Sequence, residues 1–136
     1  MFHIAKTFIL IIGLAAAAQT ALFASAKAAE QLTATQQIAA DWDRAAFSLH
    51  DPSAQLQALS ETREKLALVL KAQPDSAPAR AWKGIVLATE ANALSGLKAL
   101  NKADAARKEL ELAIGQDPNP TGDGFALAIL GTLYDS

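Results

Sequence analysis

Side chains that can bind metals or catalyse reactions are few in this 136-residue chain. Cysteine is absent, which excludes thiol catalysis, disulfide bonds and thiolate metal sites. His50 is the only histidine besides His3, and it stands directly before Asp51-Pro52. A useful metal site needs three or four converging ligands. We therefore interpret His50 as a solvated or capping residue at the end of a helix.

One short segment gathers oxygen ligands and glycines. Asp117, Asn119 and Asp123 carry side-chain oxygens of the kind that calcium prefers. Two prolines restrict the backbone among them, and no closing carboxylate follows, so we predict a turn. Gly122 and Gly124 lie in the same segment without a strand before them, which is not the context of a phosphate-binding loop.

Acidic side chains occur at short helical spacing in two places. Glu61 and Glu64 form one pair, and Glu109 and Glu111 form the other. A catalytic carboxylate pair needs a buried pocket that shifts its pKa values. Both pairs fit solvated helix faces, so we predict surface charges. The sequence thus contains no set of residues that predicts a catalytic, cofactor or metal site, and we expect a protein that is not an enzyme.

The two tryptophans are the remaining candidates for ligand contact. Trp42 and Trp82 each fall on the apolar face of an expected helix. Large aromatic side chains contribute most when they bury area. We therefore predict that both residues are part of the core at helix–helix interfaces, and we keep ligand stacking as the alternative.

The N-terminus has the layout of a secretory signal peptide, which we assign to residues 1–28. Lys6 precedes an apolar stretch at residues 8–18, and small residues follow. Two overlapping Ala-x-Ala sites, Ala24-Ser25-Ala26 and Ala26-Lys27-Ala28, suit signal peptidase. The alternative is a retained anchor across residues 7–26, but the apolar core is short for a membrane span.

Export to the periplasm, or secretion, is the localisation that this layout predicts, with an inner-membrane anchor as the alternative. Cleavage would remove Lys6 and Lys27, two of 12 basic residues, and none of the 14 acidic ones, so the mature chain carries a net charge of −4. Such a chain has no general attraction for nucleic acid or anionic lipid.

The mature part, residues 29–136, is expected to be one all-α domain, because helix formers dominate and no long alternation argues for a strand. The first helix should begin at a capping Thr33 or Thr35 and end at His50. Asp51 and Pro52 should start a second helix that stops before residue 73. Neighbours so close in sequence should pack as antiparallel hairpins.

Three more helices follow in the pattern. The third should start at Ser76 and break at Ser95-Gly96, with a short bridge over residues 97–100. The fourth should begin at residues 101–104 and end at Ile114, with Gly115 as its C-terminal cap. Residues 118–124 are predicted to be a loop, and residues 125–134 a fifth helix.

Two pieces of the chain resemble the tetratricopeptide repeat. Ala106, Leu110, Ala113 and Pro118 follow the spacing of the repeat's second helix, with Leu in place of the usual Phe. Leu130-Gly131-Thr132-Leu133-Tyr134 is similar to its Leu-Gly-x-x-Tyr step. The resemblance implies that Gly131 permits close helix packing and that Tyr134 fills the groove between helices.

The chain departs from the repeat between its hairpins. Pro74 and Pro118 are 44 residues apart, against a repeat of about 34. Thr62 stands where a small Ala is usual, and Lys83 where Leu is usual. The chain is therefore similar to a degenerate, exported member of this class, built as a short solenoid of stacked antiparallel hairpins.

The resemblance implies a helical surface that binds a peptide or protein without catalysis. We therefore predict a non-enzymatic periplasmic scaffold for a peptide or protein partner. The alternative is a small-ligand-binding accessory protein of an uptake system, and a purely structural helical fragment is the third reading. Sequence alone assigns no binding residue, because such positions differ among members of the class.

The fifth expected helix is apolar around most of its circumference, through Phe125, Leu127, Ile129, Leu130, Leu133 and Tyr134. A helix apolar on all sides normally needs burial on several sides. Terminal repeats usually present a polar outer face. We therefore expect either a chain truncated at its C-terminus or self-association through residues 125–134. The alternative is a frayed tail with scattered exposed apolar side chains.

Overall fold

The computed structural model describes residues 23, 25–27, 29–30 and 33–135. It divides into two compact units, residues 1–34 and residues 35–136. Most of the expected signal peptide, including Ala24 and Ala28 of the two cleavage sites, lies outside the described residues. No helix among the described residues is long and apolar enough to cross a membrane.

In the first unit the described residues are helical. The hydroxyl of Thr33 donates to the backbone carbonyl oxygen of Ala29 at 2.9 Å. Residues 29–30 and 33–43 are helical, so described helical residues precede both Thr33 and, in the second unit, Thr35. Our prediction that one of them caps the first helix was wrong, because helical residues already occur at 29–30 and 33–34.

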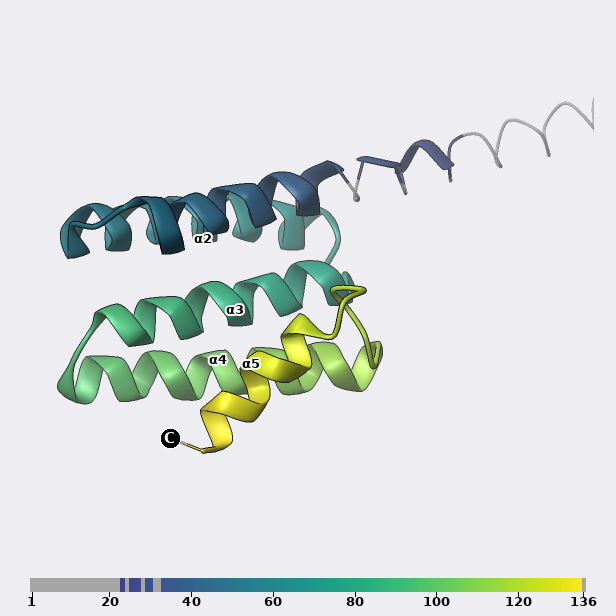
Figure 1. The fold of residues 1–136 in the computed structure, drawn as a ribbon. Helices are drawn as coiled ribbons and strands as arrows, with labels where there is room; N and C mark the ends of the chain where they lie inside the picture. Colours follow the sequence, from purple (N-terminus) through teal and green to yellow (C-terminus); the bar gives the residue numbers. More distant parts are fainter. Residues whose placement is uncertain (1–22, 24, 28, 31–32, 136) are drawn as a thin grey trace, which may run out of the picture. The chain divides into compact units, whose positions relative to one another are not determined.

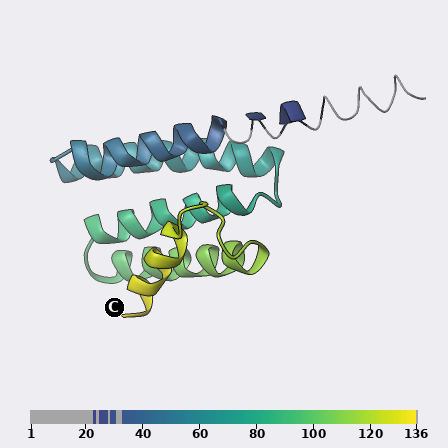
Figure 2. The same ribbon diagram turned by 45° about the vertical axis from the view of Figure 1, so that its right-hand side comes forward.

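The second unit is all-α, and its described residues contain no strand. Helical residues 35–43 continue into a five-residue π-helix, η1 (Arg44–Ser48). Four α-helices follow: α2 (Pro52–Ala72), α3 (Ala77–Ala93), α4 (Gly96–Gln116) and α5 (Phe125–Tyr134). Consecutive helices are antiparallel and stack side by side, and α5 crosses the pair formed by α3 and α4 obliquely (Figures 1 and 2).

Local signals position two of the helix starts. The side chain of Asp51 accepts a hydrogen bond from the backbone N–H of Ala54 at 2.9 Å, and Pro52 opens α2. Ser76 accepts from the backbone N–H of Ala79 at 3.3 Å at the start of α3. Both caps satisfy amides that the helix itself leaves free. The cap at Asp51 and the helix start at Ser76 were predicted.

Two predicted boundaries in the second half of the unit were wrong. The chain breaks at Leu94 and Ser95, but α4 begins at once with Gly96, which adopts a φ of +62°, so no separate bridge exists. The left-handed Gly96 completes the turn that Leu94 and Ser95 begin, and residues 97–100 are already helical. The fourth helix also runs past Gly115 to Gln116, with Asp117 as its C-terminal cap.

Helix α3 is the centre of the core. It packs against α2 on one side and against α4 and α5 on the other. One buried cluster joins Leu59 and Leu66 of α2 to α3, and a second joins Ile85 of α3 to Leu110 of α4 and to α5. Because α3 carries a buried residue on nearly every side, its position determines the positions of its neighbours.

Candidate functional site

A cleft of about 370 Å³ opens beside α3, and most of the side chains that line it are aromatic or small. We call it the aromatic cleft. Helical residues 35–48, α3 and α5 supply most of its walls, and α2 adds one side chain. Its lining residues are Trp42, Ala46, Phe47, Gln55, Thr89, Asn92, Ala93, Phe125 and Ile129.

Trp42 is the centre of an aromatic cluster at this cleft. Its ring lies 5.3 Å from that of Phe125, 5.6 Å from that of Phe47 and 5.8 Å from that of Trp82, centroid to centroid. The contacts with Phe125 and Phe47 are edge-to-face, a favoured geometry of aromatic pairs. Three separate segments of the chain therefore meet at one indole ring.

A hydrogen bond sets the orientation of that ring. The indole Nε1–H of Trp42 donates to the hydroxyl oxygen of Thr89 at 2.8 Å, and the Thr89 hydroxyl donates to the carbonyl oxygen of Ile85 at 2.9 Å. An indole has a single donor, and burial without a partner is costly. Thr89 thus holds the ring against α3 and leaves its aromatic faces for packing.

The π-helix η1 brings Phe47 to the edge of the cleft. Phe47 is 68% exposed although its ring packs edge-on against Trp42. Gln55 of α2 donates its side-chain amide to the carbonyl oxygens of Ala45 and Ala46, at 3.2 and 3.4 Å. Single-turn π-helices occur frequently at functional sites, where they displace a side chain from its α-helical direction.

The cleft is neutral and mixed in polarity. Among the described residues that line it, none carries a charge. Its polar groups are the amides of Gln55 and Asn92 and the hydroxyl of Thr89. An exposed aromatic edge beside a few amides suits an uncharged aromatic or aliphatic group.

Sequence reasoning assigned both tryptophans to the core, and the structure confirms this in part. Both are partly buried and pack against the buried clusters of the second unit. It missed Phe47 and Phe125 as their partners. A signal for this grouping was present, because each aromatic residue belongs to the first helix of an expected hairpin.

Two glutamates form ion pairs that the sequence did not predict. Glu90 of α3 is 3% exposed and lies 2.9 Å from Arg63 of α2 and 3.3 Å from Lys102 of α4. Glu109 of α4, which we assigned to the surface, lies 3.1 Å from both Arg80 and Lys83 of α3. These pairs were hard to infer because lysine and arginine side chains are long enough to reach partners on a neighbouring helix.

The loop residues considered as calcium ligands contact backbone amides instead. Asp117 accepts from the N–H of Asn119 at 3.0 Å, and Asn119 accepts from the N–H of Gly124 at 2.9 Å. Asp123 accepts from the N–H of Phe125 at 3.0 Å. The hydrogen bonds that Asp123 accepts from Thr121 and from Phe125 lower its carboxyl pKa. These are the bonds of turns and helix caps.

The other candidates lie apart from the aromatic cleft. His50 is exposed between η1 and α2. Glu61 is exposed and accepts a hydrogen bond from Gln57 at 3.2 Å, and Glu64 is exposed as well. Glu111 accepts the hydroxyl hydrogen of Tyr134. The described part of the chain contains no group of three or more acidic or histidine side chains suited to hold a metal ion.

The fifth helix only partly matches what its resemblance implied. Ala126 and Leu130 are buried, but Leu127 and Tyr134 are 56% and 60% exposed. A Cβ atom on Gly131 would meet no neighbouring atom of the described structure within 4 Å, so this glycine does not serve a close helix contact. Self-association through residues 125–134 stays a prediction, which sedimentation of the purified protein at several concentrations would test.

No family model matches the chain, and comparison with curated proteins and with solved structures found no match.

Proposed function

We propose that this chain is a non-enzymatic periplasmic scaffold that binds a peptide or protein partner at the aromatic cleft. The observation that carries the proposal is the exposed Phe47, held beside Trp42 by a π-helix. Covering an exposed aromatic ring with a partner is favourable, because it removes apolar surface from water. Aromatic residues of this kind dominate the binding energy of protein interfaces.

The arrangement of the helices supports a peptide rather than a compact ligand. Residues 35–48, α3 and α5 are the first helices of successive hairpins, and each contributes to the cleft. A surface built from successive hairpins extends along the stack, which suits an elongated ligand. This arrangement supports the proposed similarity to a degenerate tetratricopeptide-like solenoid.

A small-ligand-binding accessory protein of an uptake system is the second candidate. The volume of about 370 Å³ is within the range of roughly 300–1,000 Å³ typical of small-molecule pockets. A compact neutral ligand would then fill the cleft alone. Binding of single amino-acid derivatives as tight as that of longer peptides would favour this candidate.

Tryptophan fluorescence offers a direct test, because both tryptophans of the chain belong to the aromatic cluster. The purified protein would be titrated with neutral, tryptophan-free peptides of two to ten residues that carry one Phe or Leu. We expect the emission to change and the affinity to rise with peptide length. N-acetyl-phenylalaninamide serves as the compact probe.

Phe47→Ala is the informative variant, because the exposed ring contributes little to folding. We expect it to weaken peptide binding at least fivefold, which corresponds to about 1 kcal/mol. The matched control is Leu68→Ala on α2, which removes an equally exposed apolar side chain (70%) away from the cleft. Equal binding by the two variants would contradict the assignment of the cleft.

Periplasmic export is part of the proposal and has its own test. Cleavage at the two Ala-x-Ala sites would leave Lys27 or Ala29 as the first residue of the mature protein. Mass spectrometry of the periplasmic fraction would identify this terminus. Intact Met1 would instead favour a retained anchor.

A further inference from the structure

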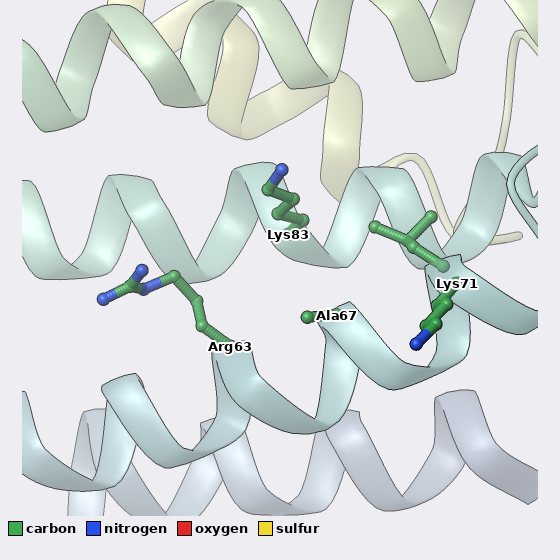
Figure 3. A pocket seen from close by; sticks show the side chains of 5 residues that line it. Arg63, Ala67, Lys71 and Lys83 are labelled. Carbon is green, nitrogen blue, oxygen red and sulfur yellow. The ribbon is translucent and has the colours of Figure 1, made fainter.

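A second cleft, of about 400 Å³, lies between α2 and α3 and shares no lining residue with the aromatic cleft. Its described lining consists of three cations, Arg63, Lys71 and Lys83, and two apolar side chains, Ala67 and Leu70. Figure 3 shows Arg63, Ala67 and Lys71 along α2, with Lys83 on α3 across from them. We call it the cationic cleft.

Cations exceed carboxylates around this cleft. Arg63 pairs with Glu90, but Glu90 is shared with Lys102. Lys83 pairs with Glu109, but Glu109 is shared with Arg80. Each carboxylate therefore neutralises one of its two cations and leaves the other uncompensated.

Lys71 adds a further positive charge to the same cleft. It is exposed near the end of α2, and none of the ion pairs in the described part of the chain includes it. None of the described residues that line the cleft is acidic. The cleft is therefore a local positive site on a chain whose net charge is −2.

The charged groups surround an apolar centre. In Figure 3 the side chains of Arg63, Lys71 and Lys83 extend in different directions, with Ala67 between them on α2. Leu70 is half-buried and Ala67 is exposed, so an apolar group seated there would cover both. Inorganic phosphate fits poorly, since it would contact the apolar centre and converge with no more than one cation.

We propose that the cationic cleft binds a short acidic peptide segment in which one apolar residue is flanked by Asp or Glu. The apolar residue covers Ala67 and Leu70, and the carboxylates pair with the cations around them. Pairs between charged groups of this kind give specificity and a faster association. The overall negative charge of the chain opposes longer polyanions and anionic membranes, so it favours a short segment.

The proposal is tested with a fluorescein-labelled peptide that has one leucine flanked on each side by two aspartates. The control peptide replaces every aspartate with asparagine. Anisotropy of the purified protein should show binding of the acidic peptide that is at least tenfold tighter and that weakens as salt is added. Equal binding of the two peptides would overturn the proposal.

Variants locate the contact. Lys71→Gln should weaken binding of the acidic peptide about two- to fivefold, the effect of one exposed ion pair. The matched control is Lys98→Gln on α4, an exposed lysine that does not line the cleft. Both are surface changes, and circular dichroism melting confirms that they fold. An equal loss of affinity in both variants would show that the effect comes from the net charge of the protein, and it would overturn the proposed site.

Competition distinguishes the occupant. Neither phosphate at matched ionic strength nor vesicles containing phosphatidylglycerol should displace the acidic peptide. Displacement by phosphate alone would identify a simple anion site, and displacement by vesicles a membrane contact, and either result overturns the peptide proposal. Phe47→Ala should leave this binding unchanged, so failure here is separate from failure at the aromatic cleft.

Discussion

A Cβ atom on Gly84 of α3 would lie 2.6 Å from Cγ of Leu110 on α4 and 3.1 Å from the carbonyl oxygen of Ala106. Leu110 is fully buried, so it has no free space into which to move. The two helices approach each other at this point because Gly84 has no side chain. The resemblance also implied a close helix contact at Gly131, but a Cβ atom there would meet no described atom within 4 Å.

Gly84→Ala should therefore destabilise the protein although alanine is the better helix former. We expect a loss of about 1–3 kcal/mol, the usual cost of overpacking a core. The matched control is Gly131→Ala in α5, where a methyl group meets open space, and it should raise stability by up to about 1 kcal/mol. Urea unfolding followed by circular dichroism measures both, and a stabilised Gly84→Ala would contradict the close contact.

Trp82→Ala tests the core assignment of the second tryptophan. Trp82 is partly buried, and its ring lies 5.8 Å from that of Trp42 and 6.2 Å from that of Phe125. We expect a loss of about 2–3 kcal/mol, below the roughly 3–5 kcal/mol of a fully buried aromatic residue. Unchanged thermal melting would place Trp82 at the surface and make it a candidate contact for the ligand.

Glu90→Gln should weaken the attachment of two helices to α3 at once. The buried carboxylate pairs with Arg63 of α2 and Lys102 of α4. Both partners are about a third exposed, so water still solvates part of their charge. We therefore expect the free energy of unfolding to fall by about 1–3 kcal/mol. Glu64→Gln, an exposed change on α2, is the control and should be neutral within about 0.5 kcal/mol. An unchanged free energy of unfolding in Glu90→Gln would show that water solvates Arg63 and Lys102 as well as the carboxylate does.

Tyr134 provides a spectroscopic test of the contact between α4 and α5. It is the only tyrosine of the chain. The hydrogen bond that its hydroxyl donates to Glu111 raises the tyrosine pKa above its ordinary value of about 10. The ultraviolet absorbance of tyrosinate should therefore appear at higher pH than in the unfolded chain.

The sign of the pH dependence follows from that raised pKa. The protonated hydroxyl stabilises the fold at every pH below the unfolded pKa, and this contribution is lost as pH rises through the folded pKa. Glu111→Gln should shift the titration midpoint to lower pH, and Glu64→Gln should leave it in place. Midpoints that coincide in the wild type and Glu111→Gln would show that the contact is absent in solution.

Features set by local chemistry were predictable from the sequence. Asp51 and Ser76 cap their helices through hydrogen bonds to amides three residues away, and Pro52 suits a first turn, so residue types and spacing were sufficient. The fifth helix was predicted with its correct bounds, residues 125–134, because a glycine-rich loop precedes a continuous apolar run. The all-α class followed from the dominance of helix-forming residues and the lack of a long apolar–polar alternation.

Features that depend on distant partners were not predictable. The sequence marks Gly96 as weak in a helix, but only its φ of +62° shows that one residue completes the turn. Nothing in the sequence around Glu90 of α3 distinguishes it from a surface glutamate, and only packing brings Arg63 and Lys102 to it. The aromatic cleft likewise joins residues far apart in the sequence: Trp42 and Phe125 are 83 positions apart, and their rings meet only in the folded chain.

The winding of the π-helix η1 sets the direction in which Phe47 points relative to Trp42. A π-helical turn holds about one residue more than an α-helical turn. If substitutions returned Arg44–Ser48 to α-helical winding with all five residues kept, Phe47 would rotate relative to Trp42 by the angle of one residue, roughly 100°. The two rings would then separate although both side chains are still present. Substitutions at positions that do not line the aromatic cleft can thus open or close it through the helical winding alone.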